Sequence, residues 1–170
     1  MPEKLSLPDD PEEILPPLSA PGMTFQNTIA FAADHAGVEL KDHLRAVAEQ
    51  HGFAVLDLGT HNPDSVDYPD YAQAAGQAIV DGHAGLGVFV CGSGTGMAIS
   101  ANKVPGIRAA NCWNIEIARL AREHNDANVL CIPARFVSAA DADRILQTFV
   151  QTKFAGGRHA IRVHKIEGSG

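Results

Sequence analysis

Residues 86–96 have the sequence LGVFVCGSGTG, in which the apolar segment Leu86–Val90 is followed by Cys91 and by three glycines in five residues. The apolar part predicts a buried strand of a parallel sheet, and α/β proteins bind ligands where such strands end. The glycines let the backbone approach a ligand closely and turn its N–H groups toward an anion. Residues 97–103 are predicted to form a short helix, whose N-terminus would favour the thiolate form of Cys91. The junction therefore predicts an anion site beside a thiol that can act as a base or a nucleophile.

Apolar segments and helical stretches alternate on both sides of this junction. Strands are predicted at 29–33, 54–58, 86–90, 109–112 and 129–132, and helices at 38–51, 71–80, 97–103, 114–123 and 138–153. The last basic segment, 158–165, could be helical or extended. This alternation predicts an α/β fold, a three-layer, doubly wound, five-stranded parallel sheet of the Rossmann-like or flavodoxin-like kind.

The domain organisation is predicted to be simple. The 170 residues suffice for one buried domain, which we place at residues 25–170. Residues 1–24 contain six of the ten prolines and several acidic residues. Such a segment cannot form a regular element, so it is predicted to be an extended or disordered N-terminal extension. The alternative is an arm that packs on a partner subunit through Ile14, Leu15 and Leu18.

Composition excludes several classes of protein. The formal net charge of −7, with no basic stripe to offset it, argues against a nucleic-acid-binding protein. Anionic small molecules remain possible, because a few local arginines outweigh a distant net charge. No apolar run approaches the roughly 18 residues of a membrane span, and the N-terminus does not resemble a secretory signal. Three cysteines without a CxxC pair suggest reduced thiols in the cytoplasm.

The glycine run does not fit the common nucleotide motifs. A GxGxxG fingerprint needs glycine at position 97, where Met97 stands, and the Gly-Lys-Ser/Thr ending of a P-loop is absent. A tight structural turn is one alternative, but a site for a non-nucleotide anion explains the run better. No HxxxH or CxxC spacing is present, so we expect neither a metal nor another cofactor.

Other polar residues follow predicted strands or end predicted helices. Asp34-His35 comes after the first strand, where a simple turn or helix cap is the alternative interpretation. His124-Asn125 ends a helix and could equally be a surface cap. Arg135 follows the fifth strand, and Arg158 and Arg162 are four residues apart in the C-terminal segment. Arginine is usually solvated surface charge, but its planar fork suits phosphate oxygens.

Taken together, these motifs resemble the ribose-5-phosphate isomerase B family, which also includes the galactose-6-phosphate isomerase subunits. The resemblance extends over roughly residues 28–165. Each motif alone is modest, but their order and spacing are specific. The matching stretches are Ile29–Phe31, Asp34–Gly37, Asp57–Thr60, Asp67–Pro69, Cys91–Gly96, Ser100–Lys103, Gly106–Ala109, Glu123–Asp126 and Gly156–His159.

The resemblance implies a metal-independent aldose–ketose isomerase that interconverts ribose 5-phosphate and ribulose 5-phosphate through a cis-enediolate. Some family members have a glutamate where this chain has Met97, so Cys91 is implied to be the base. Ser93 would pass a proton between O1 and O2, and Asp34 and His124 would open the furanose ring. The remaining implied roles are an oxyanion hole (Gly92, Ser93, Gly94, Thr95, Gly96), sugar contacts (His35, Tyr68, Asn125) and a phosphate clamp (His35, Arg135, Arg158, Arg162).

The resemblance also implies a homodimer or tetramer whose sites are completed by the neighbouring subunit, with a phosphorylated sugar as substrate. Two alternatives stay open. The preferred substrate could be allose 6-phosphate, galactose 6-phosphate or erythrulose 4-phosphate, or the protein could bind a sugar phosphate without converting it. Cys91, Asp34 and His124 argue against mere binding, because a sensor needs no groups for proton transfer. A nucleotide-binding flavodoxin-like protein is a third, weaker alternative.

Overall fold

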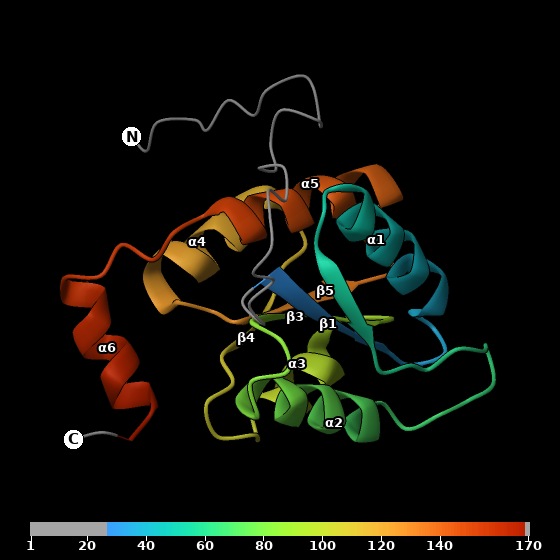
Figure 1. Cartoon of the computed structure of the whole chain (residues 1–170), viewed down its shortest axis with the longest axis horizontal. Coiled ribbons are helices and arrows are strands. Elements are labelled where there is room, and N and C mark those ends of the chain that lie inside the picture. The colour runs from blue at the N-terminus through green and yellow to red at the C-terminus, as the bar shows by residue number, and fades with distance from the viewer. Residues whose placement is uncertain (1–26, 169–170) are drawn as a thin grey trace.

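The computed structural model describes residues 27–168 and shows a five-stranded parallel sheet with helices on both faces (Figure 1). Its strands are β1 (Thr28–Ala33), β2 (Ala54–Asp57), β3 (Leu86–Cys91), β4 (Ala109–Asn111) and β5 (Val129–Pro133). They lie in the order β2-β1-β3-β5-β4, and every neighbouring pair is parallel. The predicted fold class is therefore confirmed. The short strand β4 lies at the edge, outside β5.

Six helices connect or follow these strands. They are α1 (Val38–Gln50), α2 (Tyr68–Val80), α3 (Thr95–Ala101), α4 (Ile115–Asn125), α5 (Ala139–Gln151) and α6 (Arg158–Ile166). Asn114 and Ser138 cap α4 and α5 by accepting hydrogen bonds from the N–H groups of Ile117 and Asp141, which confirms both predicted helix starts.

Some predicted boundaries were wrong near the glycine run and the loop that precedes α2. The helix α2 begins three residues earlier than predicted, at Tyr68, because Pro69 fits its first turn. The helix α3 spans residues 95–101 instead of 97–103. The basic segment at the C-terminus, left open from the sequence, is the helix α6.

The sheet separates two apolar layers. Alternate residues of β1 point to opposite faces, so Ile29 and Phe31 pack with α1, α4 and α5, whereas Ala30 and Ala32 face α2 and α3. Figure 1 shows α1, α4 and α5 above the sheet and α2 and α3 below it. The small side chains on the lower face allow the alanine-rich helix α2 to lie close to the strands.

The neighbouring strands β1 and β3 form a crevice at their carboxyl ends. The chain leaves β1 for a helix on one face and leaves β3 for a helix on the other, and such switch points hold ligands in α/β proteins. At Gly37 an added Cβ would lie 2.4 Å from the carbonyl oxygen of Val90, so only glycine permits this approach. The N–H of Asp34 donates to that same oxygen at 3.2 Å. The turn after β1 is thereby fixed beside the end of β3.

The helix α6 lies to one side of the domain, after an extended connection from α5, and packs beside α4 (Figure 1). The N-terminal extension predicted at residues 1–24 lies outside the described residues. No helix between residues 27 and 168 is long and apolar enough to cross a lipid bilayer.

Candidate active site

A cavity of about 590 Å³ lies at the crevice between the ends of β1 and β3. It brings together most of the residues predicted from the sequence to form the proton-transfer part of the site. The side chains and backbone that line it belong to Asp34, His35, Ala36, Tyr68, Cys91, Gly92, Ser93, Thr95, Gly96, Ile99, Arg135 and Phe136.

Cys91 is the last residue of β3, and its side chain is 4% exposed. The backbone N–H of Gly94 donates a hydrogen bond to its Sγ at 3.1 Å. This bond is possible because Gly94 has a φ of 73°, a conformation that favours glycine, and so folds the turn back over the sulfur. A hydrogen bond from a backbone N–H stabilises a thiolate more than a thiol. The sulfur is thus held at the cavity with a backbone donor directed at it.

Asp34 and His35 occupy the turn after β1. The Asp34 Oδ1 accepts hydrogen bonds from the N–H groups of Ala36 and Gly37 at 2.9 and 3.2 Å, so this carboxylate does stabilise a turn. It also lines the cavity, although it is only 8% exposed. The Nδ1 of His35 accepts from the N–H of Val66 at 3.3 Å, which places the proton of the neutral ring on Nε2. Asp34 therefore stabilises the turn after β1, and Asp34 and His35 both line the cavity, so the two interpretations of this pair are compatible.

Tyr68 and Arg135 lie against the two ends of the glycine turn. An added Cβ at Gly96 would lie 2.7 Å from the Tyr68 ring, so the ring packs directly on the backbone there. An added Cβ at Gly92 would lie 3.1 Å from a guanidinium nitrogen of Arg135. The backbone N–H of Arg135 also donates to the carbonyl oxygen of Gly92 at 3.1 Å. A cation thus lies beside the turn, as anion binding requires.

A buried lysine that was not predicted from the sequence, Lys41, supports the loop that follows β2. The Lys41 Nζ, fully buried, contacts both carboxylate oxygens of Asp57 at 3.0 and 2.8 Å. Gly59, whose N–H donates to Asp57, pairs through its own carbonyl oxygen with the N–H of Ala33. The only sequence signal was Lys41 itself, which lies close to Leu40 and Leu44 in the helix predicted at 38–51, although lysine side chains are usually solvated.

The carboxyl group of Asp57 is acidic for a reason that this geometry explains. Burial raises its pKa, but the hydrogen bonds from Lys41 and Gly59 and the positive charges of Lys41 and His61 outweigh that effect. The pKa of Asp57 therefore lies below its ordinary value of 3.8. The ion pair stays charged at neutral pH and holds the end of β2.

Four other predicted residues form a second group on α4 and α6 that does not line this cavity, namely His124, Asn125, Arg158 and Arg162. The ring of His124, at the end of α4, stacks on that of His159 with 4.2 Å between centroids and 8° between planes. Arg158 and Arg162 lie on the first turns of α6, and both are exposed. Burial, together with the positive charges of His124, Arg158 and Arg162, lowers the pKa of His159. The structure thus divides the predicted site between two regions of one chain.

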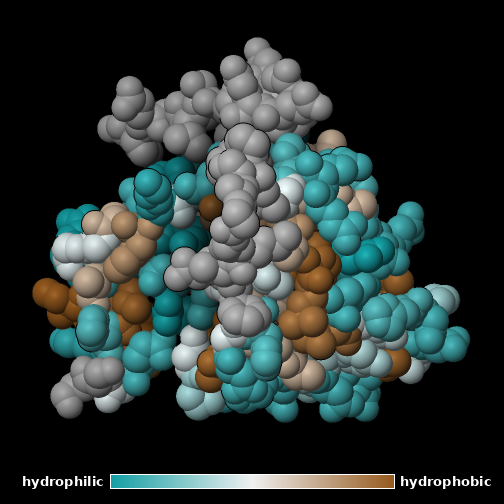
Figure 2. All heavy atoms as spheres, viewed as in Figure 1, coloured by the Kyte–Doolittle hydropathy of each residue, from teal (hydrophilic) through white to brown (hydrophobic). Residues whose placement is uncertain are grey.

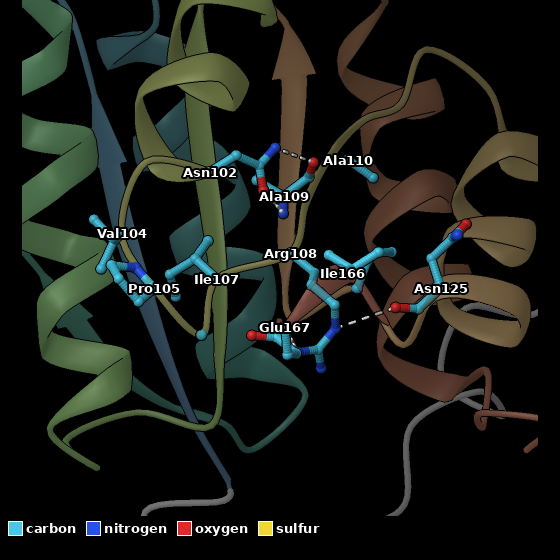
Figure 3. A pocket seen from close by; sticks show the side chains of 12 residues that line it. Asn102, Val104, Pro105, Ile107, Arg108, Ala109, Ala110, Asn125, Ile166 and Glu167 are labelled. Carbon is cyan, nitrogen blue, oxygen red and sulfur yellow. Dashed lines mark hydrogen bonds and ion pairs between the residues drawn. The ribbon is translucent and has the colours of Figure 1, made fainter. Parts of the chain in front are cut away.

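A second cavity, of about 500 Å³, lies where the connection to β4 meets the ends of α4 and α6, and Asn125 lines it (Figure 3). Arg108 crosses this region. Its Nε donates to the carbonyl oxygens of Asn125 and Asp126 at 3.2 and 2.9 Å, and another guanidinium nitrogen pairs with Glu167 at 2.5 Å. Arg108 therefore ties the end of α4 to the end of α6.

Within residues 27–168, no three side chains of histidine, cysteine, aspartate or glutamate are grouped so that they could hold a metal ion. The three cysteines are all free thiols. Burial raises the pKa of Cys112 to about 12, and burial also raises the pKa of Cys131 well above its ordinary value. Of the three, Cys91 is the thiol that lines the cavity.

Comparison with known proteins agrees with this fold. A family model described as ribose/galactose isomerase matches residues 29–166. The ribose-5-phosphate isomerase B of Escherichia coli is 40% identical over 138 residues, which are 81% of this chain and 93% of that protein. A solved ribose 5-phosphate isomerase from Thermotoga maritima is 47% identical, with a TM-score of 0.81, over 83% of this chain and 97% of that one.

A further solved structure shows a related protein with a ligand. It is ribose-5-phosphate isomerase B from Mycoplasma genitalium with bound ribulose-5-phosphate, and it covers 84% of this chain and 95% of its own. It is 37% identical, with a TM-score of 0.80. The fold and the cavity define an α/β protein with a candidate ligand site at the carboxyl ends of its parallel strands. The chain belongs to the ribose/galactose isomerase family.

Proposed function

We propose that the protein interconverts ribose 5-phosphate and ribulose 5-phosphate through a cis-enediolate, without a metal. The observation that carries this proposal is the Cys91 sulfur at 3.1 Å from the Gly94 N–H, in a cavity that also holds Asp34 and Arg135. Those groups are what an aldose–ketose isomerase needs, namely a base, an acid–base partner and a cation for the phosphate. The relatives named above support ribose 5-phosphate as the substrate.

The chemical step starts from the open-chain aldose. The Cys91 thiolate takes the proton from C2, the C2–H electrons form the C1–C2 double bond, and O1 becomes the oxyanion. The Ser93 hydroxyl relays a proton from O2 to O1, and Cys91 returns its proton to C1 to give the ketose. N–H groups of the glycine turn stabilise the oxyanion. The Gly94 N–H is committed to the sulfur and the Thr95 N–H donates to the Ser93 Oγ at 3.4 Å, so this role falls on the N–H groups of Gly92, Ser93 and Gly96.

The remaining roles concern the ring and the phosphate. Asp34 and His124 open the furanose ring by moving protons between the ring oxygen and O1. Tyr68 and Asn125 contact the sugar hydroxyls. The phosphate is bound by one histidine and three arginines, since planar guanidinium groups match phosphate oxygens. These residues are His35, Arg135, Arg158 and Arg162.

We further propose that a second copy of the chain completes each site, in a dimer or a pair of dimers. His124 and the α6 arginines lie outside the cavity of their own chain, although the chemistry needs them there. Large apolar side chains are exposed at the cavity rim, where Phe136 is 75% and Ile99 59% exposed. Figure 2 shows further apolar atoms exposed along α6, which carries Ile161 and Ile166. Burial of these groups against a partner would favour association. The free thiols fit a cytoplasmic location.

The test is the variant Cys91→Ala, assayed for conversion of ribose 5-phosphate. Loss of the base is expected to lower kcat by about 10²- to 10⁴-fold, while binding of the sugar phosphate persists. Cys112→Ala is the matched control, because that thiol is buried in the opposite layer of the core and should leave kcat unchanged. Wild-type turnover by Cys91→Ala would remove the thiol from the mechanism.

The assay also separates the alternatives. Ribose 5-phosphate, allose 6-phosphate, galactose 6-phosphate and erythrulose 4-phosphate are compared in parallel, since they differ in chain length and stereochemistry. A higher kcat/KM for one of the other three would reassign the substrate. Binding of ribose 5-phosphate without exchange of its C2 proton with solvent would instead indicate a sugar-phosphate sensor.

A further inference from the structure

Asn111, the last residue of the edge strand β4, lies next to the glycine turn without lining the cavity. Its Nδ2 donates to the carbonyl oxygen of Ser93 at 3.0 Å and contacts the Thr95 hydroxyl at 3.3 Å. These two partners precede and follow Gly94 in the chain. The side chain therefore joins the two arms of the turn that folds over Cys91.

The orientation of this amide follows from its partners. A carbonyl oxygen can only accept, so the NH₂ group of Asn111 has to face Ser93. The Oδ1 atom is then buried, and it has no hydrogen-bond partner within the described part of the chain. An unpaired buried acceptor is unfavourable, so the two donated bonds have to outweigh its cost. The same Oδ1 lies 2.2 Å from where a Cβ on Gly94 would be, so the amide packs directly against that glycine.

We propose that Asn111 is a positioning residue for Cys91, holding the turn so that the N–H of Gly94 stays on the sulfur. The connection runs from Asn111 through Ser93 and Thr95 to Gly94, whose N–H reaches Sγ at 3.1 Å. Glycine is conformationally free, so the turn needs an external support to keep one geometry. This inference rests on the proposed function, in which the Cys91 thiolate is the base.

No motif or local pattern of residues points to Asn111 as a functional residue. Asn111 falls within the predicted strand 109–112 and matches none of the motifs of the family resemblance. Its role depends on β4 lying beside β5, which brings the end of β4 next to the turn after β3. Only the strand order of the folded sheet makes the contact.

The experiment compares Asn111→Leu, which is similar in size but has no donor, with the wild type. The rate at which iodoacetamide alkylates Cys91 is measured against pH, with mass spectrometry to identify the modified thiol. Loss of two hydrogen bonds is expected to slow alkylation at pH 7 roughly tenfold, with a similar fall in kcat and little change in KM. The two alkylation rates converge at alkaline pH, where the thiol ionises in both proteins.

Two further variants keep the test decisive. Asn111→Asp has the same shape, so it retains the packing on Gly94, but it loses the donor and adds a negative charge. The alkylation rate and kcat are both expected to fall further than in Asn111→Leu. Asn102→Leu is the matched control, because Asn102 makes two comparable hydrogen bonds to Ala109 at the other end of β4. It should lower the melting temperature and leave the alkylation of Cys91 unchanged.

The outcomes distinguish this inference from the proposed function. If the wild type converts none of the four sugar phosphates, the proposed function fails, yet alkylation still reports whether Asn111 supports the thiolate. An alkylation profile of Asn111→Asp that coincides with the wild type would overturn the role of Asn111. An equally slow alkylation of Cys91 in Asn102→Leu would also overturn the role of Asn111, because the effect would then come from a disturbance of β4 as a whole.

Discussion

The two regions that carry the candidate site are built in different ways. Around Cys91, the site lies at strand ends, where the N–H of Gly94 donates to the sulfur and Asn111 holds the glycine turn. At the ends of α4 and α6, it consists of longer side chains on helices, with Arg158 and Arg162 exposed. The first region is fixed by the sheet of its own chain, whereas the second extends outward from it.

This difference corresponds to a difference in chemical demand. Proton transfer at carbon requires the base to be held within a small fraction of an ångström, so a buried strand end is a suitable position. A phosphate is large and doubly charged, so flexible arginines on a helix can bind it from outside. In the proposed assembly, one chain would supply the rigid half of each site and its neighbour the charged half.

The largest expected effect comes from mixing two inactive variants. Cys91→Ala damages the strand-end region, and His124→Asn damages the helix-end region. If each site combines the two regions from different chains, a mixed dimer contains one site with both residues intact. An equal mixture should then recover about a quarter of wild-type activity after subunit exchange, since half of the dimers are mixed.

Two changes within the same region serve as the control for this mixture. Cys91→Ala mixed with Ser93→Ala leaves every site damaged, so no recovery is expected. If the Cys91→Ala and His124→Asn mixture also stayed inactive although mixed dimers were detected by mass spectrometry, both regions would belong to a single chain.

The next effect concerns the charged region alone. Arg162→Ala removes a guanidinium group proposed to bind the phosphate, and hydrogen bonds to charged groups contribute about 1.5–3 kcal/mol. KM for ribose 5-phosphate should therefore rise by roughly 10- to 100-fold, while kcat changes less. Arg144→Ala is the control, because Arg144 is exposed on α5 and pairs only with Asp141 among the described residues. An unchanged KM in Arg162→Ala would show that Arg162 does not bind the phosphate.

A smaller effect is expected when the hydrogen bonds by which Arg108 joins the ends of α4 and α6 are weakened. Arg108→Lys keeps the positive charge but cannot reach Asn125, Asp126 and Glu167 at once, because lysine lacks the planar fork (Figure 3). We expect kcat/KM to fall roughly fivefold, within the 0.5–1.5 kcal/mol of a typical hydrogen bond. Glu167→Gln, which weakens only the link to α6, should have a lesser effect. Steady-state kinetics equal to the wild type in both would show that the helix ends need no such support.

The smallest effect on activity, with a clear effect on stability, is expected for Asp57→Asn. The variant leaves Lys41 buried with a weaker partner, which should lower the free energy of unfolding at pH 7 by about 1–3 kcal/mol. The pKa of Asp57 is lower in the folded than in the unfolded protein. Its contribution to stability is therefore present above pH 3.8 and is lost as pH falls through the folded-state value.

Urea unfolding at several pH values measures this contribution. The difference between wild type and Asp57→Asn should be large at pH 7 and shrink below about pH 4, as the carboxylate of the wild type is protonated. Asp64→Asn, in the exposed loop after β2, is the control and should behave like the wild type. A difference that stayed constant down to pH 3 would exclude the charge of Asp57 as its cause.

Much of the fold followed from local patterns. Buried parallel strands have continuous apolar sequences, and helix starts have side-chain caps such as Asn114 and Ser138, so both were predictable. The start of α2 was misplaced because Asp67-Tyr68-Pro69 looks like part of a loop until the first helical turn forms. Lys41 was missed because a lysine within an apolar stripe gives no sign of its partner, which is sixteen residues away in sequence.

The sequence by itself determined the sheet, the glycine turn and the residue types of the site, since these depend on neighbouring residues and on the order of motifs. Only the tertiary structure decided which of those residues meet. It placed Cys91, Asp34 and Arg135 at one crevice, because β1 and β5 both pair with β3, and left His124 and Arg162 elsewhere. It also brought Asn111 to the glycine turn, because β4 pairs with β5. Such contacts arise from the strand order, which no local pattern of residues specifies.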